Sequence, residues 1–143
     1  MDYSKLSDFE INAAVFENLH GGAPDYKEGD SGAMVLISYE GDVVSGDAVE
    51  VEVERGVFNP CKNPADAWPI IVGHKLSLIN ADDEWLCVPD DTAVDGTTGD
   101  EVQMIYSGDG HVHANPLRAA MVVFLMQQES ANVQANPARS DIR

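Results

Sequence analysis

Hydrophobic positions recur with a helical period in the first twenty residues of the chain. The segment from Ser7 to Glu10 has the composition of a capping box, in which each side chain bonds the backbone N–H of the other residue. Gly21 follows the apolar positions and provides a glycine C-cap. The pattern predicts a helix that ends near residue 20, with a loop at 21–32. Its expected apolar face consists of Phe9, Val15, Phe16 and Leu19.

Alternation with a period of two predicts strands in the middle of the chain. Residues 33–39 form an apolar run, and residues 49–53 alternate valine with glutamate. In the second segment the valines are expected to face the core, with the glutamates on the solvent side. Turn-forming residues separate further apolar runs. These predict strands at 75–79, 85–88, 102–106 and 111–114, a turn at 80–83 and a loop at 89–100.

Two Asn-Pro pairs predict the starts of two more helices. Asn63 and Asn115 are good N-cap residues, and proline suits the first helical position. Pro69 lies inside the first of these helices, which is therefore expected to be short or kinked. The second helix is apolar on nearly all sides, which predicts that it is central and that Phe124 is fully buried.

The order of these elements predicts an α+β fold. Antiparallel hairpins are expected to pack on the central buried C-terminal helix, beside an N-terminal helix and the short kinked Asn-Pro helix. The length of 143 residues suits one domain. Because hydrophobic periodicity ends near Ser130, we assign residues 1–129 to that domain and residues 130–143 to a mobile tail.

Composition narrows the class of protein. No apolar run approaches the ~18 residues that span a bilayer, and the acidic, polar N-terminus does not resemble a secretory signal. We therefore expect a cytoplasmic protein in which the two cysteines, Cys61 and Cys87, remain reduced and buried. Trp68 and Trp85 are expected to anchor the core.

The strong negative charge of the chain limits its possible binding partners. The chain has 8 basic and 25 acidic residues, a net charge of −17, which excludes direct binding to nucleic acid or an anionic membrane because phosphate contacts require Lys and Arg. Nine acids and no Lys or Arg lie between Lys75 and Arg118, and another nine acids occur from Asp25 to Glu54 against one lysine. Solubility alone is the simpler explanation, but it predicts a more even distribution.

Three segments resemble a known family. They are MDYSKLSDFEIN at the start, NPADAWPIIV in the centre and NPLRAAMVVFLM near the end. In this order and near this spacing they resemble the NinX type of small lambdoid-phage accessory proteins, whose domain has no assigned function. The resemblance implies a phage or prophage origin, expression in the host bacterial cytoplasm, and neither an enzyme nor a cofactor.

Candidate chemistry is sparse. Asp109, His111 and His113 alternate, so a strand would present a carboxylate and two imidazoles on one face, which is metal-ligand chemistry. No fourth ligand is evident nearby in the sequence, and we predict that no metal is required. A catalytic Cys87 would need a base such as His74 or His113. The chain has no nucleotide-binding, serine-hydrolase or zinc-protease motif.

Two hypotheses of function remain open. The first is a non-enzymatic binder whose acidic surface occupies a basic, nucleic-acid-binding site on a host protein, for counter-defence or host modulation. On a strand, the charges of Glu50, Glu52 and Glu54 would be ~6.8 Å apart, whereas the charges along one DNA strand are ~3.4 Å apart. Mimicry of DNA by this strand would therefore need a second acidic row beside it. The alternative is a small enzyme or ligand-binding protein with a pocket containing His111, His113 or Cys87. The partner-binding residues of the first hypothesis are Glu50, Glu52, Glu54, Asp82, Asp83, Glu84, Asp90 and Asp91.

Overall fold

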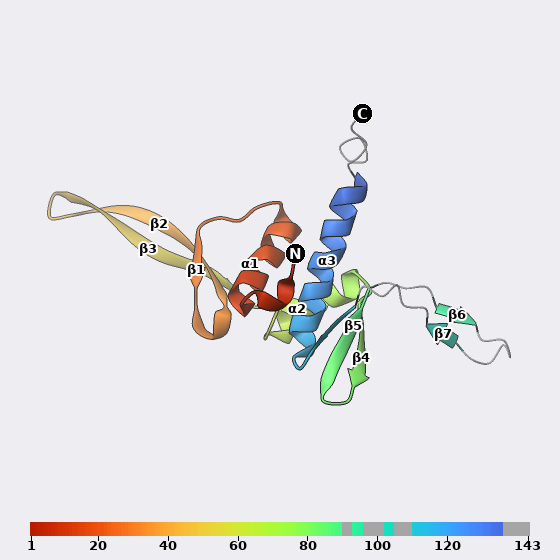
Figure 1. The fold of residues 1–143 in the computed structure, drawn as a ribbon. Helices are drawn as coiled ribbons and strands as arrows, with labels where there is room; N and C mark the ends of the chain where they lie inside the picture. Colours follow the sequence, from red (N-terminus) through yellow and green to blue (C-terminus); the bar gives the residue numbers. More distant parts are fainter. Residues whose placement is uncertain (90–92, 96–101, 105–109, 136–143) are drawn as a thin grey trace.

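A computed structural model places a long C-terminal helix at the centre of the molecule, with the other helices and a small sheet around it (Figure 1). It describes residues 1–89, 93–95, 102–104 and 110–135. The helices are α1 (Asp8–His20), α2 (Pro64–Gly73), α3 (Pro116–Ala135) and the 3₁₀ turns η1 (Tyr3–Lys5) and η2 (Asp30–Gly32). The strands are β1 (Tyr26–Glu28), β2 (Met34–Val44), β3 (Asp47–Phe58), β4 (Ser77–Ala81), β5 (Glu84–Val88), β6 (Ala93–Asp95), β7 (Val102–Met104) and β8 (His111–His113).

All strand pairings among the described residues are antiparallel. One sheet has the order β1-β2-β3, a second has the order β4-β5-β8, and β6 pairs with β7. The central helix α3 packs on β5 and β8 and on α1 and α2. The predicted α+β fold, with hairpins packed on a central C-terminal helix, is therefore confirmed.

The core is built around α3. Every residue from Ala119 to Leu125 is buried, and Phe124 is 1% exposed, as predicted. Asn115 caps the helix, because its Oδ1 atom accepts a hydrogen bond from the Leu117 N–H at 2.9 Å. The helix continues to Ala135, past the predicted domain boundary at residue 129. The mobility of the tail stays a prediction, and residues 136–143 lie outside the described part of the chain.

Helix α1 begins and ends as its sequence predicts. The Glu10 N–H donates to Ser7 Oγ at 3.1 Å and the Ser7 N–H donates to Glu10 Oε1 at 2.9 Å, which completes the capping box. Gly21 ends the helix in the left-handed conformation, at φ 73°. The predicted apolar face is partly wrong, because Leu19 is 38% exposed while the polar Asn12 is fully buried.

Helix α2 is short, as expected, with Asn63 as its N-cap and Pro69 inside it. Its buried positions are Ala67, Ile70 and Ile71. Trp68 is 62% exposed and lies one residue from this stripe, so the prediction that it anchors the core is wrong. Trp85 on β5 is also exposed, at 38%. The reason for Trp68 is that a helix buries one face, and the residue after a buried position turns about 100° away from it.

Strands β2 and β3 form a hairpin that projects from the body, and we call this hairpin the arm (Figure 1). Its base is buried at Met34, Val35 and Ile37. Farther out, Val49 and Val51 are 39% and 48% exposed, so the prediction that these valines face the core is wrong. The alternation does correspond to a strand, but the outer part of this strand extends beyond the core, so its valines are exposed to solvent.

Two segments predicted as loops contain short strands. Strand β1 lies within residues 21–32 and pairs with the base of β2, from Tyr26 opposite Leu36 to Glu28 opposite Met34. Strand β6 lies within residues 89–100 and pairs with β7. Each strand has three residues, too few for alternation to distinguish it from a loop.

Candidate functional site

The predicted partner-binding acids lie on separate hairpins. Glu50, Glu52 and Glu54 are on β3 in the arm, whereas Asp82 and Asp83 form the turn after β4. Figure 1 shows that the arm and the β4–β5 hairpin point in different directions from the body. The structure therefore places these acids on two projections rather than on one continuous face. Glu84 begins β5, and Asp90 and Asp91 lie outside the described residues.

Glutamates and uncharged residues share one face of the arm, which we call the glutamate face. Residues directly opposite in an antiparallel pair point to the same side of a sheet. Glu52 pairs with Tyr39 and Glu50 pairs with Gly41. Tyr39 is 52% exposed. The partner strand β2 therefore adds no second acidic row on this face, and the row that DNA mimicry would require is missing from it.

Lys27 of β1 neutralises part of the glutamate face. Its ammonium group bonds Glu52 and lies 3.7 Å from Glu54 Oε1. The hydrogen bond to Glu52 raises the pKa of Lys27, and the charges of both glutamates add to the effect. No ion pair among the described residues includes Glu50. The negative charge that remains accessible therefore lies toward the outer part of the arm.

The opposite face of the arm, the valine face, carries Val49 and Val51. Val51 pairs with Glu40, whose Oε1 atom lies 2.6 Å from Arg55 Nη2. Arg55 also donates from Nε to Ser38 Oγ at 2.7 Å. Across both faces, strands β1, β2 and β3 contain seven carboxylates and two cationic side chains, which leaves five negative charges.

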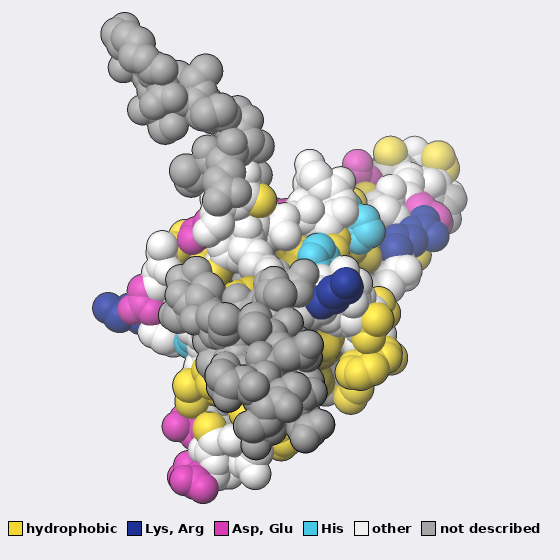
Figure 2. Space-filling model, turned by 90° about the vertical axis from the view of Figure 1, so that its right-hand side faces the viewer, with side chains coloured by type: hydrophobic (Ala, Val, Ile, Leu, Met, Phe, Trp, Pro, Cys, Tyr) yellow, Lys and Arg dark blue, Asp and Glu magenta, His cyan; other side chains and the backbone are white. Residues whose placement is uncertain are grey.

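The β4–β5 hairpin ends in a compact acidic turn. Asp82 has a positive φ of 61°, and Asp82, Asp83 and Glu84 are all exposed. Figure 2 shows acidic side chains at the lower end of the molecule, where this hairpin ends in Figure 1. None of the ion pairs of the described residues involves these three carboxylates. They form a small acidic tip with no exposed strand edge as long as that of the arm.

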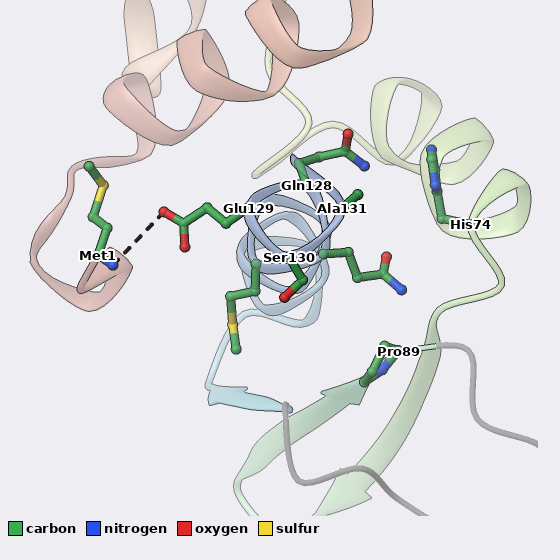
Figure 3. Close-up of a pocket in the computed structure, with 9 residues that line it drawn as sticks. Met1, His74, Pro89, Gln128, Glu129, Ser130 and Ala131 are labelled. Carbon is green, nitrogen blue, oxygen red and sulfur yellow. Dashed lines mark ion pairs between the residues drawn. The ribbon is translucent and has the colours of Figure 1, made fainter. Parts of the chain in front are cut away.

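A cavity of about 570 Å³ lies around the outer half of α3 (Figure 3). Met1 lies on one side of the helix, with its ammonium group 3.8 Å from Glu129 Oε1, and His74 and Pro89 lie on the other side. Cys87, His111 and His113 do not line it. This cavity therefore does not assemble the residues that the alternative hypothesis of a ligand pocket names.

The two thiols are poor candidates for nucleophiles. Cys61 and Cys87 are free and completely buried, and burial raises the pKa of each to about 12. A nucleophilic cysteine needs the opposite change, a lowered pKa and access to substrate. The structure confirms that both side chains are buried, and no disulfide joins them.

The two histidines of the metal-site candidate, His111 and His113, lie two residues apart on β8. Asn115 donates its N–H to His113 Nδ1 at 2.9 Å, so this nitrogen acts as an acceptor within the protein. Burial lowers the pKa of His111, and the charges of His113 and Arg118 lower it further. Asp109 lies outside the described residues, among which no group of three or more metal-binding side chains occurs. That no metal is required stays a prediction.

Sequence reasoning missed a buried polar junction around Asn12. Asn12 donates from Nδ2 to Gly32 O at 2.9 Å and to Asn59 Oδ1 at 2.8 Å. It also accepts from the Cys61 N–H at 3.1 Å. The signal was present in the sequence, because a polar residue follows Ile11 within the apolar stripe of the first helix. These contacts hold α1 against two loops, which is a structural role.

Together these features define an α+β protein with a projecting acidic hairpin. In the described part of the chain, neither cysteine has the exposure or the lowered pKa of a catalytic nucleophile. The chain belongs to the NinX family of bacteriophage P22, whose family model matches residues 2–128. The resemblance of the three sequence segments is thereby confirmed, and the protein is a phage accessory protein. No curated protein and no solved structure matches the chain. None of the described helices is long and apolar enough to cross a membrane.

Proposed function

We propose that this protein is a non-enzymatic binder that acts in the host bacterial cytoplasm by occupying a basic, nucleic-acid-binding site on a host protein. The partner would be a restriction, recombination, transcription or defence factor, and the effect would be counter-defence or host modulation. The family membership supports a phage context, and the charge of −17 favours a basic partner.

One observation carries this proposal: the acidic arm projects from the body with exposed apolar side chains on both faces. A two-stranded hairpin without a covering layer is marginally stable at best in water. The protein nevertheless exposes Tyr39, Val49 and Val51 there, beside Glu50 and Glu52. Apolar contacts supply affinity and charge complementarity speeds association, so the combination suits a protein-binding element.

The partner's site is expected to recognise negative charges at the spacing of alternate residues on a β-strand, and not at the spacing of phosphates in duplex DNA. Alternate residues of a strand are ~6.8 Å apart, about twice the ~3.4 Å charge spacing of one DNA strand. The residues opposite Glu50 and Glu52 are Gly41 and Tyr39, which do not fill the gaps with charge. Competition with nucleic acid would then follow from occupying the same basic residues, without mimicry of the duplex geometry.

Two charge-neutralised variants test the proposal and locate the surface. The arm variant carries Glu50→Gln, Glu52→Gln and Glu54→Gln, and the matched variant changes the acidic tip by Asp82→Asn, Asp83→Asn and Glu84→Gln. Each removes three negative charges from an exposed hairpin. Both are compared with the unmodified protein in affinity purification from the bacterial host at low and high salt, since salt screens exposed charges.

A captured protein is then purified and tested for displacement of its nucleic acid by the phage protein. We expect the arm variant to lose displacement and the tip variant to retain most of it. If both folded variants displace nucleic acid as well as the unmodified protein does, and support phage growth equally, the proposal is wrong.

A further inference from the structure

The outer edge of β3 has no strand beside it in the described part of the molecule. The sheet order β1-β2-β3 puts β3 at the edge along its whole length, from Asp47 to Phe58. Among the described residues, the backbone groups on this edge form no hydrogen bond with the backbone of another segment. Edge strands expose a row of N–H and C=O groups that can pair with another chain, and proteins commonly protect them with charged side chains, proline, β-bulges or a covering element. Strand β3 has no proline, and from Asp47 to Glu54 its charged side chains are all acidic, so they oppose a like-charged strand but not a basic one.

The side chains along this edge sort by chemistry onto its two faces. Glu50 and Glu52 lie on the glutamate face, while Val49 and Val51 lie on the valine face, because successive residues of a strand alternate. Regular pairing extends from Asp47 to Glu54, and Arg55 is the extra residue of a bulge. About eight residues of edge are therefore available in one continuous register.

We propose, resting on the function proposed above, that a partner adds an extended segment of alternating basic and apolar residues to the β3 edge. Its main chain pairs with the free N–H and C=O groups of β3. Its Lys or Arg side chains lie beside Glu50 and Glu52, and its apolar side chains lie beside Val49 and Val51. Strand addition of this kind takes affinity from main-chain hydrogen bonds and specificity from alternate side chains.

Charge selects this occupant over a second copy of the protein. An antiparallel pair of β3 edges would bring the glutamates of both copies onto one face, and like charges across a strand pair are destabilising. Two chains of charge −17 also repel each other as whole molecules. An incoming strand with basic residues on the glutamate face removes both penalties.

A synthetic peptide of about eight residues that alternates lysine with valine tests the pairing on the full-length protein. One control has the same composition with all lysines first and all valines last, so its charge is unchanged but its alternation is lost. Two further controls carry N-methyl groups either on the lysines or on the valines, which removes the backbone donors from one edge or the other. We expect the alternating peptide to bind at least about tenfold more tightly than the block peptide. One N-methylated peptide should lose binding by a similar factor while the other retains it.

Protein variants separate strand addition from general attraction of a cationic peptide. The variant with Glu50→Gln and Glu52→Gln should lose affinity for the alternating peptide, whereas Asp82→Asn with Asp83→Asn removes the same charge elsewhere and should bind nearly normally. Equal binding of alternating and block peptides, or of both N-methylated peptides, would overturn strand addition. A dimer that forms in the absence of peptide and becomes tighter in the variant with Glu50→Gln and Glu52→Gln would also overturn it, in favour of self-pairing through β3. The arm variant could fail to displace nucleic acid from the host protein while the unmodified protein binds the alternating and block peptides equally well. That result would support the proposed function and refute only this inference.

Discussion

Arg118 on the central helix forms a partly buried ion pair with Asp8 at the start of α1. The Arg118 Nη1 atom lies 2.6 Å from Asp8 Oδ1, and Nη2 donates to Leu6 O at 2.6 Å. Arg118 is only 7% exposed, so its guanidinium group depends on these partners in place of water. The pair joins residues 110 positions apart and fixes the first helix to the last.

Removing the carboxylate from this pair should destabilise the protein strongly. In Asp8→Ala the guanidinium of Arg118 stays buried without its counter-ion, at an expected cost of about 3–5 kcal/mol. Denaturant unfolding measures the loss. The matched control is Glu40→Ala, which breaks the exposed pair to Arg55 of the same 2.6 Å separation and should cost about 1 kcal/mol or less.

A double variant checks the cause of that destabilisation. Adding Arg118→Met to Asp8→Ala removes the orphaned charge, so the double variant should be more stable than the sum of the two single losses predicts. Strict additivity would mean that Asp8 stabilises the protein for a different reason, such as its place in the first turn of α1.

Two aromatic residues should differ sharply in their contribution to stability. Phe124→Ala opens a cavity at the centre of the core and should lower the free energy of unfolding by about 3–5 kcal/mol. Trp68→Ala removes a larger side chain that is 62% exposed, and should cost less than about 1 kcal/mol. Chemical denaturation of both variants makes the comparison. A larger loss for Trp68 than for Phe124 would contradict the assignment of the core to α3.

The cysteines should be unreactive while the protein is folded. Burial raises the pKa of Cys61 and Cys87 to about 12, so almost no thiolate is present near neutral pH. A chromogenic thiol reagent should modify neither residue rapidly in the native protein and should modify both after denaturation. Rapid stoichiometric modification of Cys87 in the folded state would revive the alternative of a thiol-dependent enzyme.

Stability should fall as the pH drops below about 6.5, in part because of His111. Burial lowers the pKa of His111 below its ordinary value of 6.5 in the folded protein. The unfolded chain therefore takes up the proton first, which favours unfolding as acid is added. His111→Gln should reduce this loss of stability between neutral and mildly acidic pH, as measured by thermal unfolding. A pH profile of His111→Gln identical to that of the unmodified protein would contradict the prediction.

Local interactions allowed much of this fold to be read from the sequence. The capping box at Ser7, the Asn-Pro caps at Asn63 and Asn115 and the glycine end at Gly21 all occur as predicted. Each depends on residues within about one helical turn, so the order of the amino acids contains the required information. The all-round apolar pattern near Phe124 likewise indicated burial, because no orientation of that helix could expose a mainly polar face.

Tertiary structure decided what those elements cover. The valines of β3 have the alternation of a half-buried strand, yet Val49 and Val51 are exposed because the arm extends past the core. Trp68 is exposed and Asn12 buried for the same kind of reason, since burial depends on which neighbouring element packs against a face. The acids of the candidate surface lie apart because the two hairpins that carry them point in different directions. Contacts between residues far apart in the sequence determine those directions. A period of two or of 3.6 residues specifies which side chains share a face, but only the packed chain specifies whether that face meets protein or water.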